Sequence, residues 1–428
     1  GIRNKSLSDA DILKSLKKLG KLHEQFKDED ILIDLLNSDN KNIRYYSVNN
    51  LAKLNNVKLL RIFENFLNKE ETSWVRRETA SAIGRLRSKK AISVMTKLLK
   101  DKDPNIILQA VRGLLVFKSD NKIEKILKNL KNHPNEIVQK VINIEFFDNR
   151  KYSSKHNEFP DYLKNCIANG DVIKLLEKVD DESVHLTFTS PPYYNARDYS
   201  IYNSYNSYLK FLWKTFEEVH RITKEGRFLI LNTSPIIIPR TGRKYSSIRY
   251  PIPFDIHSEM IKMGWEYVDD IVWLKPEPSA KNRVAGFNLH RKPLAYKPNC
   301  VTETLMVYRK KSNKLIDWIF KQYPEDIIKK SKIKDGYETS NVWKIDPSSD
   351  KNHSAVFPIK LCDKVINYYS FVGDLIFDPF AGSGSVGLSA IKNNRHFFLT
   401  ELNKDYFKIL KDKFKSNLFD DFKIGINK

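Results

Sequence analysis

The sequence of 428 residues has few cysteines, no long apolar run and no histidine pattern typical of a metal site. None of its three cysteines forms a closely spaced pair, so we expect no disulfide or zinc site and a reducing, cytoplasmic location. No apolar run approaches the roughly 20 residues that span a bilayer, and no signal peptide is visible, so we expect no membrane partner. The nine histidines lack ligand spacing, and we assign no metal.

Acidic residues are outnumbered by basic ones, with 52 Asp and Glu against 74 Lys and Arg. The resulting net charge of +22 favours an anionic partner. The length suffices for two domains, and residues 148–160 are polar without apolar periodicity, which indicates a linker. We therefore expect one domain over residues 1–147 and a second over 161–428.

The first informative motif follows Val184–Phe188, an apolar stretch that we predict to be a short buried strand. Two prolines end this strand, and the Ser190 hydroxyl and the Ser190 and Pro191 carbonyls can then accept hydrogen bonds from an amino group on a flat ring. Pro192 completes the turn, and Tyr193 offers a face for stacking. The alternative is a strand-ending turn without chemistry, because Ser-Pro-Pro-Tyr also occurs in loops and proline-rich ligands.

The second motif predicts a strand, a glycine turn and a helix. Leu375–Phe377 is apolar, the stretch 378–387 reads Asp-Pro-Phe-Ala-Gly-Ser-Gly-Ser-Val-Gly, and Leu388–Lys392 is typical of a helix. Glycines allow close backbone approach, and the amides at a helix N-terminus favour a polar or anionic ligand group. The next strand, His396–Thr400, leads to Glu401, an acid placed where it can accept both hydroxyls of a ribose. The spacing indicates a nucleoside-containing cofactor.

The same glycines also satisfy the dinucleotide fingerprint, so a nicotinamide or flavin enzyme is the rival interpretation. Asp378 argues against it, because a carboxylate just before the glycines would repel a pyrophosphate but attract an ammonium group. A cofactor with a cationic amino-acid tail fits better.

Together the two motifs resemble those of bacterial and archaeal DNA amino-methyltransferases that use S-adenosylmethionine. The resemblance covers roughly residues 160–417, and the order, with the catalytic motif before the cofactor motif, is that of the permuted beta class. Serine before the two prolines is typical of enzymes that methylate the N4 amino group of cytosine; the N6 amino group of adenine is the near alternative. Methylation at cytosine C5 needs a nucleophilic cysteine, which typically follows a proline. None of the three cysteines in this sequence follows a proline, so that mechanism is disfavoured.

The resemblance also implies roles for individual residues. Ser190 and the Pro191 carbonyl orient the amino group, Pro192 shapes the turn, and Tyr193 stacks on a base flipped out of the duplex. The implied cofactor-binding positions are Asp171, Phe357, Pro358, Asp378, Phe380, Gly382, Gly384 and Glu401. Asp171 would accept from the adenine amino group, with a helix cap as its alternative role. For Phe357 and Pro358, which would line the methionine end, the alternative is core packing.

Further apolar runs at 227–232, 270–274 and 303–308 predict more strands, and residues 208–222 predict a helix. The fold class is therefore α/β, a doubly wound and mainly parallel sheet with a Rossmann-like arrangement, preceded by an all-α domain. In such a sheet ligands bind beyond the carboxyl ends of the strands, where both motifs fall. Basic loops predicted to contact double-stranded DNA contain Arg240, Arg243, Lys244, Lys281, Arg283, Arg291 and Lys292. Residues 310–343 lie where the beta class keeps its target-recognition segment.

The first domain contains a repeat with an offset of about 32 residues. Apolar positions 43, 48, 51 and 54 recur at 75, 80, 83 and 86, and then at 106, 111, 114 and 117. A second apolar helix follows each unit, so we expect a solenoid similar to HEAT repeats, with a generic helical bundle as the alternative. The domain carries roughly half of the excess positive charge, which slightly favours DNA over a protein such as a cognate restriction enzyme as its partner.

Two hypotheses of different class follow. The first is a site-specific DNA amino-methyltransferase, cytosine-N4 preferred over adenine-N6. The second is a non-catalytic DNA-binding protein that uses its helical repeats; an RNA or protein methyltransferase fits the serine motif less well. A homodimer, which the resemblance allows, has no signature in the sequence.

Overall fold

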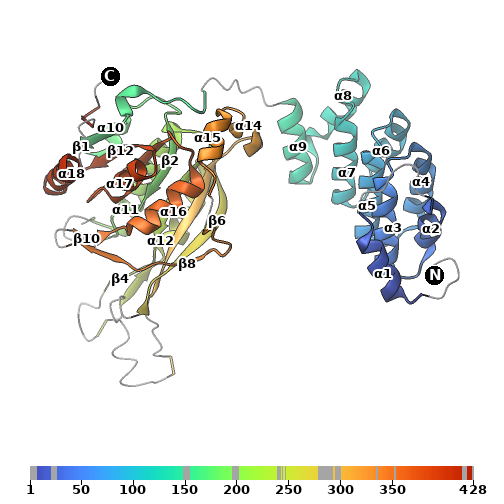
Figure 1. Ribbon diagram of the computed structural model, residues 1–428, viewed down its shortest axis with the longest axis horizontal. Helices are drawn as coiled ribbons and strands as arrows, with labels where there is room; N and C mark the ends of the chain where they lie inside the picture. The colour runs from blue at the N-terminus through green and yellow to red at the C-terminus, as the bar shows by residue number, and fades with distance from the viewer. Residues whose placement is uncertain are drawn as a thin grey trace. The chain divides into compact units, whose positions relative to one another are not determined.

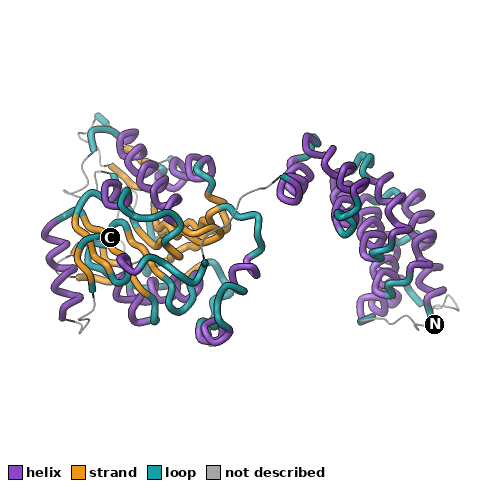
Figure 2. The backbone as a smooth tube through the Cα atoms, turned by 90° about the horizontal axis from the view of Figure 1, so that it is seen from above, coloured by secondary structure: helices purple, strands orange, loops and turns teal. Residues whose placement is uncertain are grey.

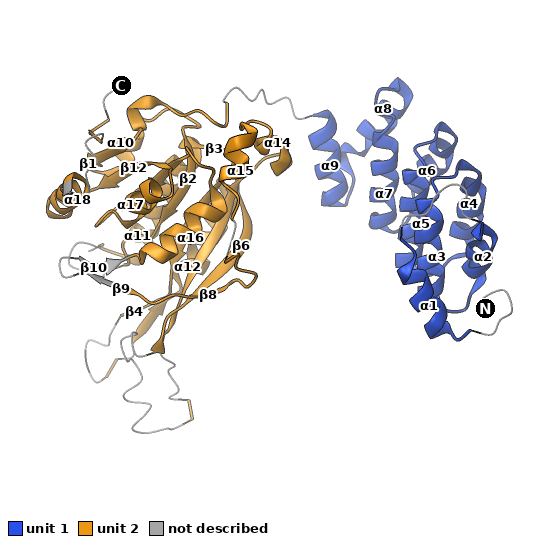
Figure 3. Cartoon of the chain, viewed as in Figure 1, with its two compact units in different colours: residues 1–151 blue, residues 152–428 orange. Residues whose placement is uncertain are grey.

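The computed structural model describes residues 7–20, 27–147, 155–194, 202–238, 242, 244–245, 247–277, 293–294, 300–333, 336–350, 353–416 and 422–426. The chain divides into two compact units, residues 1–151 and 152–428 (Figure 3). Within the described ranges, no helix has the length and the apolar character needed to cross a membrane.

The described part of the first unit is built from helices (Figure 2). Their bounds are α1 Asp9–Lys18, α2 Glu29–Asp34, α3 Lys41–Lys53, α4 Leu60–Lys69, α5 Ser73–Arg85, α6 Ile92–Leu98, α7 Pro104–Leu115, α8 Asn121–Lys128 and α9 Glu136–Phe146. Side chains cap two of these helices: Asp103 caps α7, whose first residue is Pro104, and Asn135 caps α9.

The repeating apolar positions form one continuous core. Almost all of the predicted positions of α3, α5 and α7 are buried in a single cluster, and Phe117 packs against it partly buried. An ion pair also repeats at the same offset: Arg44 binds Glu70, and Arg76 binds Asp101 at 2.7 Å. Each pair joins the start of one repeat to the segment before the next, so it is a structural contact between neighbouring repeats.

The second unit contains a nine-stranded sheet in the order β13-β1-β12-β11-β2-β3-β7-β6-β8 (Figure 1). The strands are β1 Cys166–Asn169, β2 Val184–Thr189, β3 Thr223–Thr233, β6 Trp265–Leu274, β7 Thr302–Lys310, β8 Val342–Lys344, β11 Leu375–Asp378, β12 His396–Glu401 and β13 Lys423–Ile424. Of these described strands, β7 alone runs antiparallel to its neighbours. Two hairpins complete the described strands, β4 Ile236–Ile238 with β5 Ile248–Tyr250, and β9 Ser348–Asp350 with β10 His353–Val356.

Helices cover both faces of this sheet because its strands are apolar on both. Along β11, Leu375 and Phe377 pack into one core and Ile376 into the other. The first core contains α10 Val172–Leu176, α11 Tyr205–Ile222 and α12 Ile252–Lys262; the second contains α16 Ile359–Tyr369, α17 Ser385–Lys392 and α18 Lys404–Ser416. The doubly wound, mainly parallel sheet predicted from the sequence is confirmed. The strands β3 and β6 are longer than predicted because Thr223–Arg227 and Trp265–Asp269 contain polar residues.

The linker predicted over residues 148–160 is too long. His156 is buried in the second unit, where its carbonyl oxygen accepts from His185 Nε2 at 2.7 Å and from the Tyr323 hydroxyl at 2.8 Å. Phe159 packs edge-on against His185. The stretch was predicted to be a linker because most of its residues are polar, but His156 and Phe159 attach it to the second unit.

The segment 310–343 lies mostly at the amino ends of the strands. Lys310 Nζ donates to the Thr223 carbonyl at 2.7 Å, at the beginning of β3. The short helices α14 Ile316–Phe320 and α15 Glu325–Lys330 flank Tyr323, whose hydroxyl donates to Asp374 immediately before β11. The motifs predicted to act on the base follow the opposite ends of these strands, so residues 310–333 lie away from them, and a target-recognition role for 310–343 stays a prediction. The order of motifs in the beta class suggested this assignment. Because β7 runs antiparallel, however, it ends at the amino edge of the sheet, and the chain continues from there.

Candidate active site

The two sequence motifs meet at the carboxyl edge of the sheet. Strands β2 and β11 are parallel neighbours, with Leu186 beside Ile376, so the loops that follow them leave the same edge. The Thr189 hydroxyl donates to Asp378 Oδ1 at 2.7 Å and joins the two motifs directly. Both loops line one cavity of about 580 Å³.

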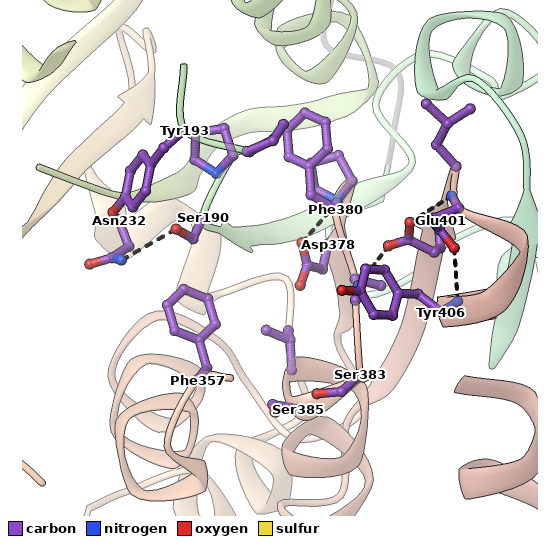
Figure 4. Close-up of a pocket in the computed structure, with 18 of the residues that line it drawn as sticks. Ser190, Tyr193, Asn232, Phe357, Asp378, Phe380, Ser383, Ser385, Glu401 and Tyr406 are labelled. Carbon is purple, nitrogen blue, oxygen red and sulfur yellow. Dashed lines mark hydrogen bonds between the residues drawn. The ribbon is translucent and has the colours of Figure 1, made fainter. Parts of the chain in front are cut away.

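One end of the cavity holds the Ser190 hydroxyl in a polar cluster (Figure 4). Asn232, at the end of β3, donates from Nδ2 to Ser190 Oγ at 3.4 Å and to Glu303 Oε2 at 2.5 Å. The Tyr193 hydroxyl lies 3.4 Å from the same Glu303 oxygen. Burial and the neighbouring Glu303 charge raise the pKa of Tyr193, so its hydroxyl stays protonated.

A lysine completes this cluster. Lys275 follows β6 and forms an ion pair with Glu303, and its Nζ lies 4.4 Å from the ring centroid of Trp273. The Trp273 indole donates to the Ile345 carbonyl at 2.7 Å, which fixes the ring beneath the lysine. Trp273, Lys275 and Glu303 all line the cavity.

Asp378 lies between Ser190 and Glu401 along the cavity (Figure 4) and is 3% exposed. Its Oδ1 accepts from Thr189 and from the Phe380 amide at 3.0 Å. Burial is the main cause that raises the pKa of Asp378 to about 7; its two hydrogen bonds oppose this rise, and the nearby Glu401 charge adds to it. A cationic ligand beside Asp378 would favour the ionised form.

Glu401 ends β12 beside the glycine turn. Its Oε2 accepts from the Gly382 amide and its Oε1 from the Asn403 amide, both at 2.8 Å. Burial raises the pKa of Glu401 despite these bonds. Gly382 has φ of +51°, in the left-handed region where glycine is favoured, which lets its amide face the carboxylate. Each carboxylate oxygen keeps a second lone pair for a ligand hydroxyl.

Most of the predicted site residues line the cavity, and two do not. The lining includes Ser190, Pro191, Pro192, Tyr193, Asp171, Phe357, Asp378, Phe380, Gly382 and Glu401. Pro358 is instead buried at the start of α16. Gly384 has φ of +79°, and a Cβ there would lie 2.5 Å from Leu410 Cδ1, so this glycine permits α17 and α18 to pack.

Two residues with competing interpretations make structural contacts and also line the cavity. Asp171 Oδ1 accepts from the Ile173 amide at 2.9 Å and caps α10, while the residue also lines the cavity. Phe357 stacks on the buried Phe188 ring at 4.7 Å between centroids and faces the cavity below Ser190 (Figure 4).

The predicted DNA-binding residues are largely outside the described part of the chain. Lys244 is described and exposed. Arg240, Arg243, Lys281, Arg283, Arg291 and Lys292 lie outside the described residues.

Sequence reasoning missed several lining residues, including Asn232, Lys275, Glu303, Ser383, Ser385 and Tyr406. Asn232 and Lys275 could have been found, because each follows or ends a predicted strand at the carboxyl edge. Glu303 could not, since its place depends on the reversed direction of β7. Among the described residues, no group of His, Cys, Asp and Glu is arranged to hold a metal ion.

Comparison with known proteins agrees with this geometry. Residues 184–412 match the family model for DNA methylases of the N6/N4 methyltransferase type, and residues 29–115 and 60–144 match HEAT repeats. The first unit is thus a helical region with HEAT-type repeats.

Curated relatives resemble the second unit. The type II beta methyltransferase M.BslI of Bacillus sp. (strain NEB-606) is 28% identical over 62% of this chain and 29% of its own length. The orphan methyltransferase M.BamHII of Bacillus amyloliquefaciens is 28% identical over 56% of this chain and 92% of its own length. The chain therefore spans less than a third of the first relative and nearly all of the second.

Among solved structures, a DNA modification methylase homologue of Thermus thermophilus in complex with S-adenosyl-L-methionine matches with a TM-score of 0.47 and 22% identity, over 62% of this chain and 100% of that one. The family match covers more than half of the chain and includes both motifs that meet at the cavity. The chain belongs to the DNA methylase family.

Proposed function

We propose that this protein transfers a methyl group from S-adenosylmethionine to the N4 amino group of cytosine in double-stranded DNA, at a specific sequence. The observation that carries the proposal is the single cavity that has Ser190 at one end, Glu401 at the other and Asp378 between them. A flipped base and a methyl donor can occupy these two ends together.

The residues at the second end suit S-adenosylmethionine. Glu401 is placed to accept the ribose hydroxyls, and Asp171 lines the same cavity, where an adenine amino group needs an acceptor. Asp378, buried and facing the cavity, suits the ammonium of the methionine portion. A cofactor with two phosphates would place negative charge beside these acids, so its binding is disfavoured.

The residues at the first end suit an aromatic amine. Ser190 Oγ keeps an unused lone pair, and the Pro191 carbonyl is a second acceptor; together they hold both N–H bonds. The nitrogen lone pair of cytosine N4 is delocalised into the ring. Acceptors that favour a more tetrahedral nitrogen return this pair to the nitrogen, which can then attack. Tyr193 is placed to stack on the ring and fix its approach.

S-adenosylmethionine supplies an electrophilic methyl carbon on a positively charged sulfur. As the N–C bond forms, the electron pair of the C–S bond stays on sulfur, and the amine releases one proton to water. Ser190 and Pro191 hold the reacting nitrogen throughout, and no covalent bond to the protein is required. The product is S-adenosylhomocysteine.

Serine before the two prolines favours cytosine N4 over adenine N6, which is the near alternative because it has the same amine chemistry. DNA contact is supported by the net charge of +22 and by the exposed Lys244. In the repeats, Arg76 and Arg85 are bound to Asp101 and Glu78. A phosphate-binding role there would rest instead on four exposed residues, Arg77, Arg87, Lys89 and Lys90.

Mass spectrometry of nucleosides tests the reaction directly. The purified protein is incubated with DNA of varied sequence and S-adenosylmethionine labelled in its methyl group, and the DNA is digested to nucleosides. Labelled 4-methylcytosine is expected. Labelled 6-methyladenine would replace the cytosine proposal with its alternative, and unmodified DNA together with calorimetric cofactor binding would favour the non-catalytic hypothesis.

Two substitutions test the site. Tyr193→Ala should abolish most methyl transfer while cofactor affinity is kept, and Gly382→Asp should abolish cofactor binding because it adds a strained side chain and a negative charge beside Glu401. Full activity in both variants would reject the proposed site.

A further inference from the structure

The base end of the cavity contains an ion pair that the reaction outlined above does not use. Lys275 directly follows β6 and Glu303 lies in β7, and their side chains are 19% and 17% exposed. An ion pair this far removed from water needs a compensating reason, because desolvation offsets much of its attraction. Both residues face the cavity next to Ser190 and Asn232.

Glu303 connects the lysine to the serine motif. One of its oxygens binds Lys275, and the other accepts from Asn232 Nδ2 at 2.5 Å and lies 3.4 Å from the Tyr193 hydroxyl. Asn232 in turn donates to Ser190 Oγ. Along the cavity wall, the Ser190 hydroxyl is therefore an acceptor. Next comes the Asn232 amide, whose two hydrogens are both donated to protein atoms, and then the Lys275 cation.

The Lys275 ammonium has three hydrogens, and Glu303 takes one of them. The Trp273 ring lies against the ammonium at 4.4 Å and limits where the other two can point. These hydrogens are donors held beside the cavity, farther along the wall than the amine acceptor.

The polar edge of cytosine matches this wall. Its amino group is followed by a ring nitrogen and then a carbonyl oxygen, both acceptors, whereas the ring nitrogen of adenine is followed by a C–H group. A cation beyond the amine acceptor can donate to both cytosine acceptors, but to only one on adenine. A buried donor left without a partner is costly, so the wrong base is disfavoured.

We infer that Lys275 reads the ring nitrogen and carbonyl of the target cytosine and that Glu303 is the positioning residue that holds Lys275 and Asn232. This inference rests on the proposed cytosine-N4 function and assigns the residues that distinguish cytosine from adenine.

The test uses the full chain and a base analogue. Once the methylated site has been mapped with the unaltered protein, kcat/KM is measured on duplexes with either deoxycytidine or 3-deazadeoxycytidine at the target, in which the ring nitrogen is replaced by C–H. The unaltered protein should prefer deoxycytidine, and Lys275→Met should lower kcat/KM on deoxycytidine by about tenfold to a hundredfold. The analogue changes amine reactivity equally for both proteins, so the ratio of the two preferences isolates the contact.

In Lys275→Met the preference for deoxycytidine over the analogue should fall by a similar factor. Glu303→Gln, which keeps an acceptor for Asn232 but removes the charge that holds the lysine, should show a smaller fall. Lys262→Met, which removes one positive charge from the exposed end of α12, is the matched control and should keep the full preference.

An unchanged preference in Lys275→Met would overturn the inference while 4-methylcytosine formation leaves the proposed function standing. Loss of S-adenosylmethionine binding in that variant, measured by calorimetry, would also overturn it, because the pair would then be structural. Formation of 6-methyladenine by the unaltered protein would remove the proposed function itself.

Discussion

The two ends of the same sheet contain similar side chains that are used in opposite ways. At the amino end, Arg227 binds Asp374, whose other oxygen accepts from the Tyr323 hydroxyl at 2.6 Å, and His185 is fully buried with both ring nitrogens hydrogen-bonded. At the carboxyl end, Asp378 and Glu401 are also largely buried, but they face a cavity.

The two ends differ in whether a cation of the chain lies beside the buried carboxylate. Burial opposes ionisation of Asp374, yet the Arg227 charge holds the pKa of Asp374 below its usual value. No cation that the described residues place beside Asp378 plays this part, and its pKa rises to about 7. The first arrangement is complete within the chain and stabilises the fold; we propose that a ligand completes the second.

The largest expected effect concerns the amino end of the sheet, where the Asp374 charge is paired within the chain. Arg227→Met would leave the Asp374 carboxylate buried without its cation, at a cost of about 3 to 5 kcal/mol in the free energy of unfolding. Urea unfolding followed by tryptophan fluorescence measures this, because five of the six tryptophans lie in the second unit. At low temperature the folded fraction should keep its methyl-transfer rate; a normal stability with lost activity would contradict the comparison.

The carboxyl end of the sheet, which faces the cavity, should respond in the opposite way. Ser190→Ala removes an acceptor from the reacting amine and should lower kcat by about 10² to 10³-fold. The free energy of unfolding should change by less than about 1 kcal/mol, since the hydrogen bond that Ser190 Oγ accepts from Asn232 is long, at 3.4 Å. Initial rates and urea unfolding on the same preparation decide the matter, and a large loss of stability would place Ser190 with the structural residues.

Gly384 tests whether a motif residue belongs to the ligand or to the fold. Gly384→Ala adds a Cβ 2.5 Å from Leu410 Cδ1 and 2.9 Å from Phe414 in a left-handed backbone, which should destabilise the unit by about 1 to 3 kcal/mol. Cofactor affinity of the folded protein, measured by calorimetry, should change little. A selective loss of affinity at unchanged stability would return Gly384 to the cofactor site.

The smallest expected effect is a pH dependence of cofactor affinity at the carboxyl end of the sheet. Cofactor binding through an ammonium requires ionised Asp378, so the affinity for S-adenosylmethionine should fall as pH drops below about 7, by at most tenfold per unit. Without cofactor the sign reverses: the raised pKa of Asp378 favours the protonated folded form, so its contribution to stability is present below the ordinary pKa and is lost as pH rises toward 7. Calorimetry between about pH 6 and 8 checks the first effect, and Asp378→Asn should flatten the profile.

Much of this site was predictable because strand ends carry it. Ser190 and Asp378 each follow a short apolar run, and parallel strands bring such ends to one edge. The residues that escaped prediction depend on strand direction and pairing. Glu303 lies near the start of the antiparallel strand β7 and reaches the cavity from there, whereas Ser190 and Asp378 reach it from the ends of parallel strands.

The sequence by itself determined the two motifs, their strand–turn contexts and the period of the helical repeats, because each depends on residues close together in the chain. Only the tertiary structure decided that Glu303 joins Lys275 to the serine motif, that Gly384 serves packing, and that residues 310–333 lie at the far end of the sheet. These depend on which strands pair and in which direction, and pairing is settled by burial of the whole sheet between two layers of helices, which no local stretch encodes.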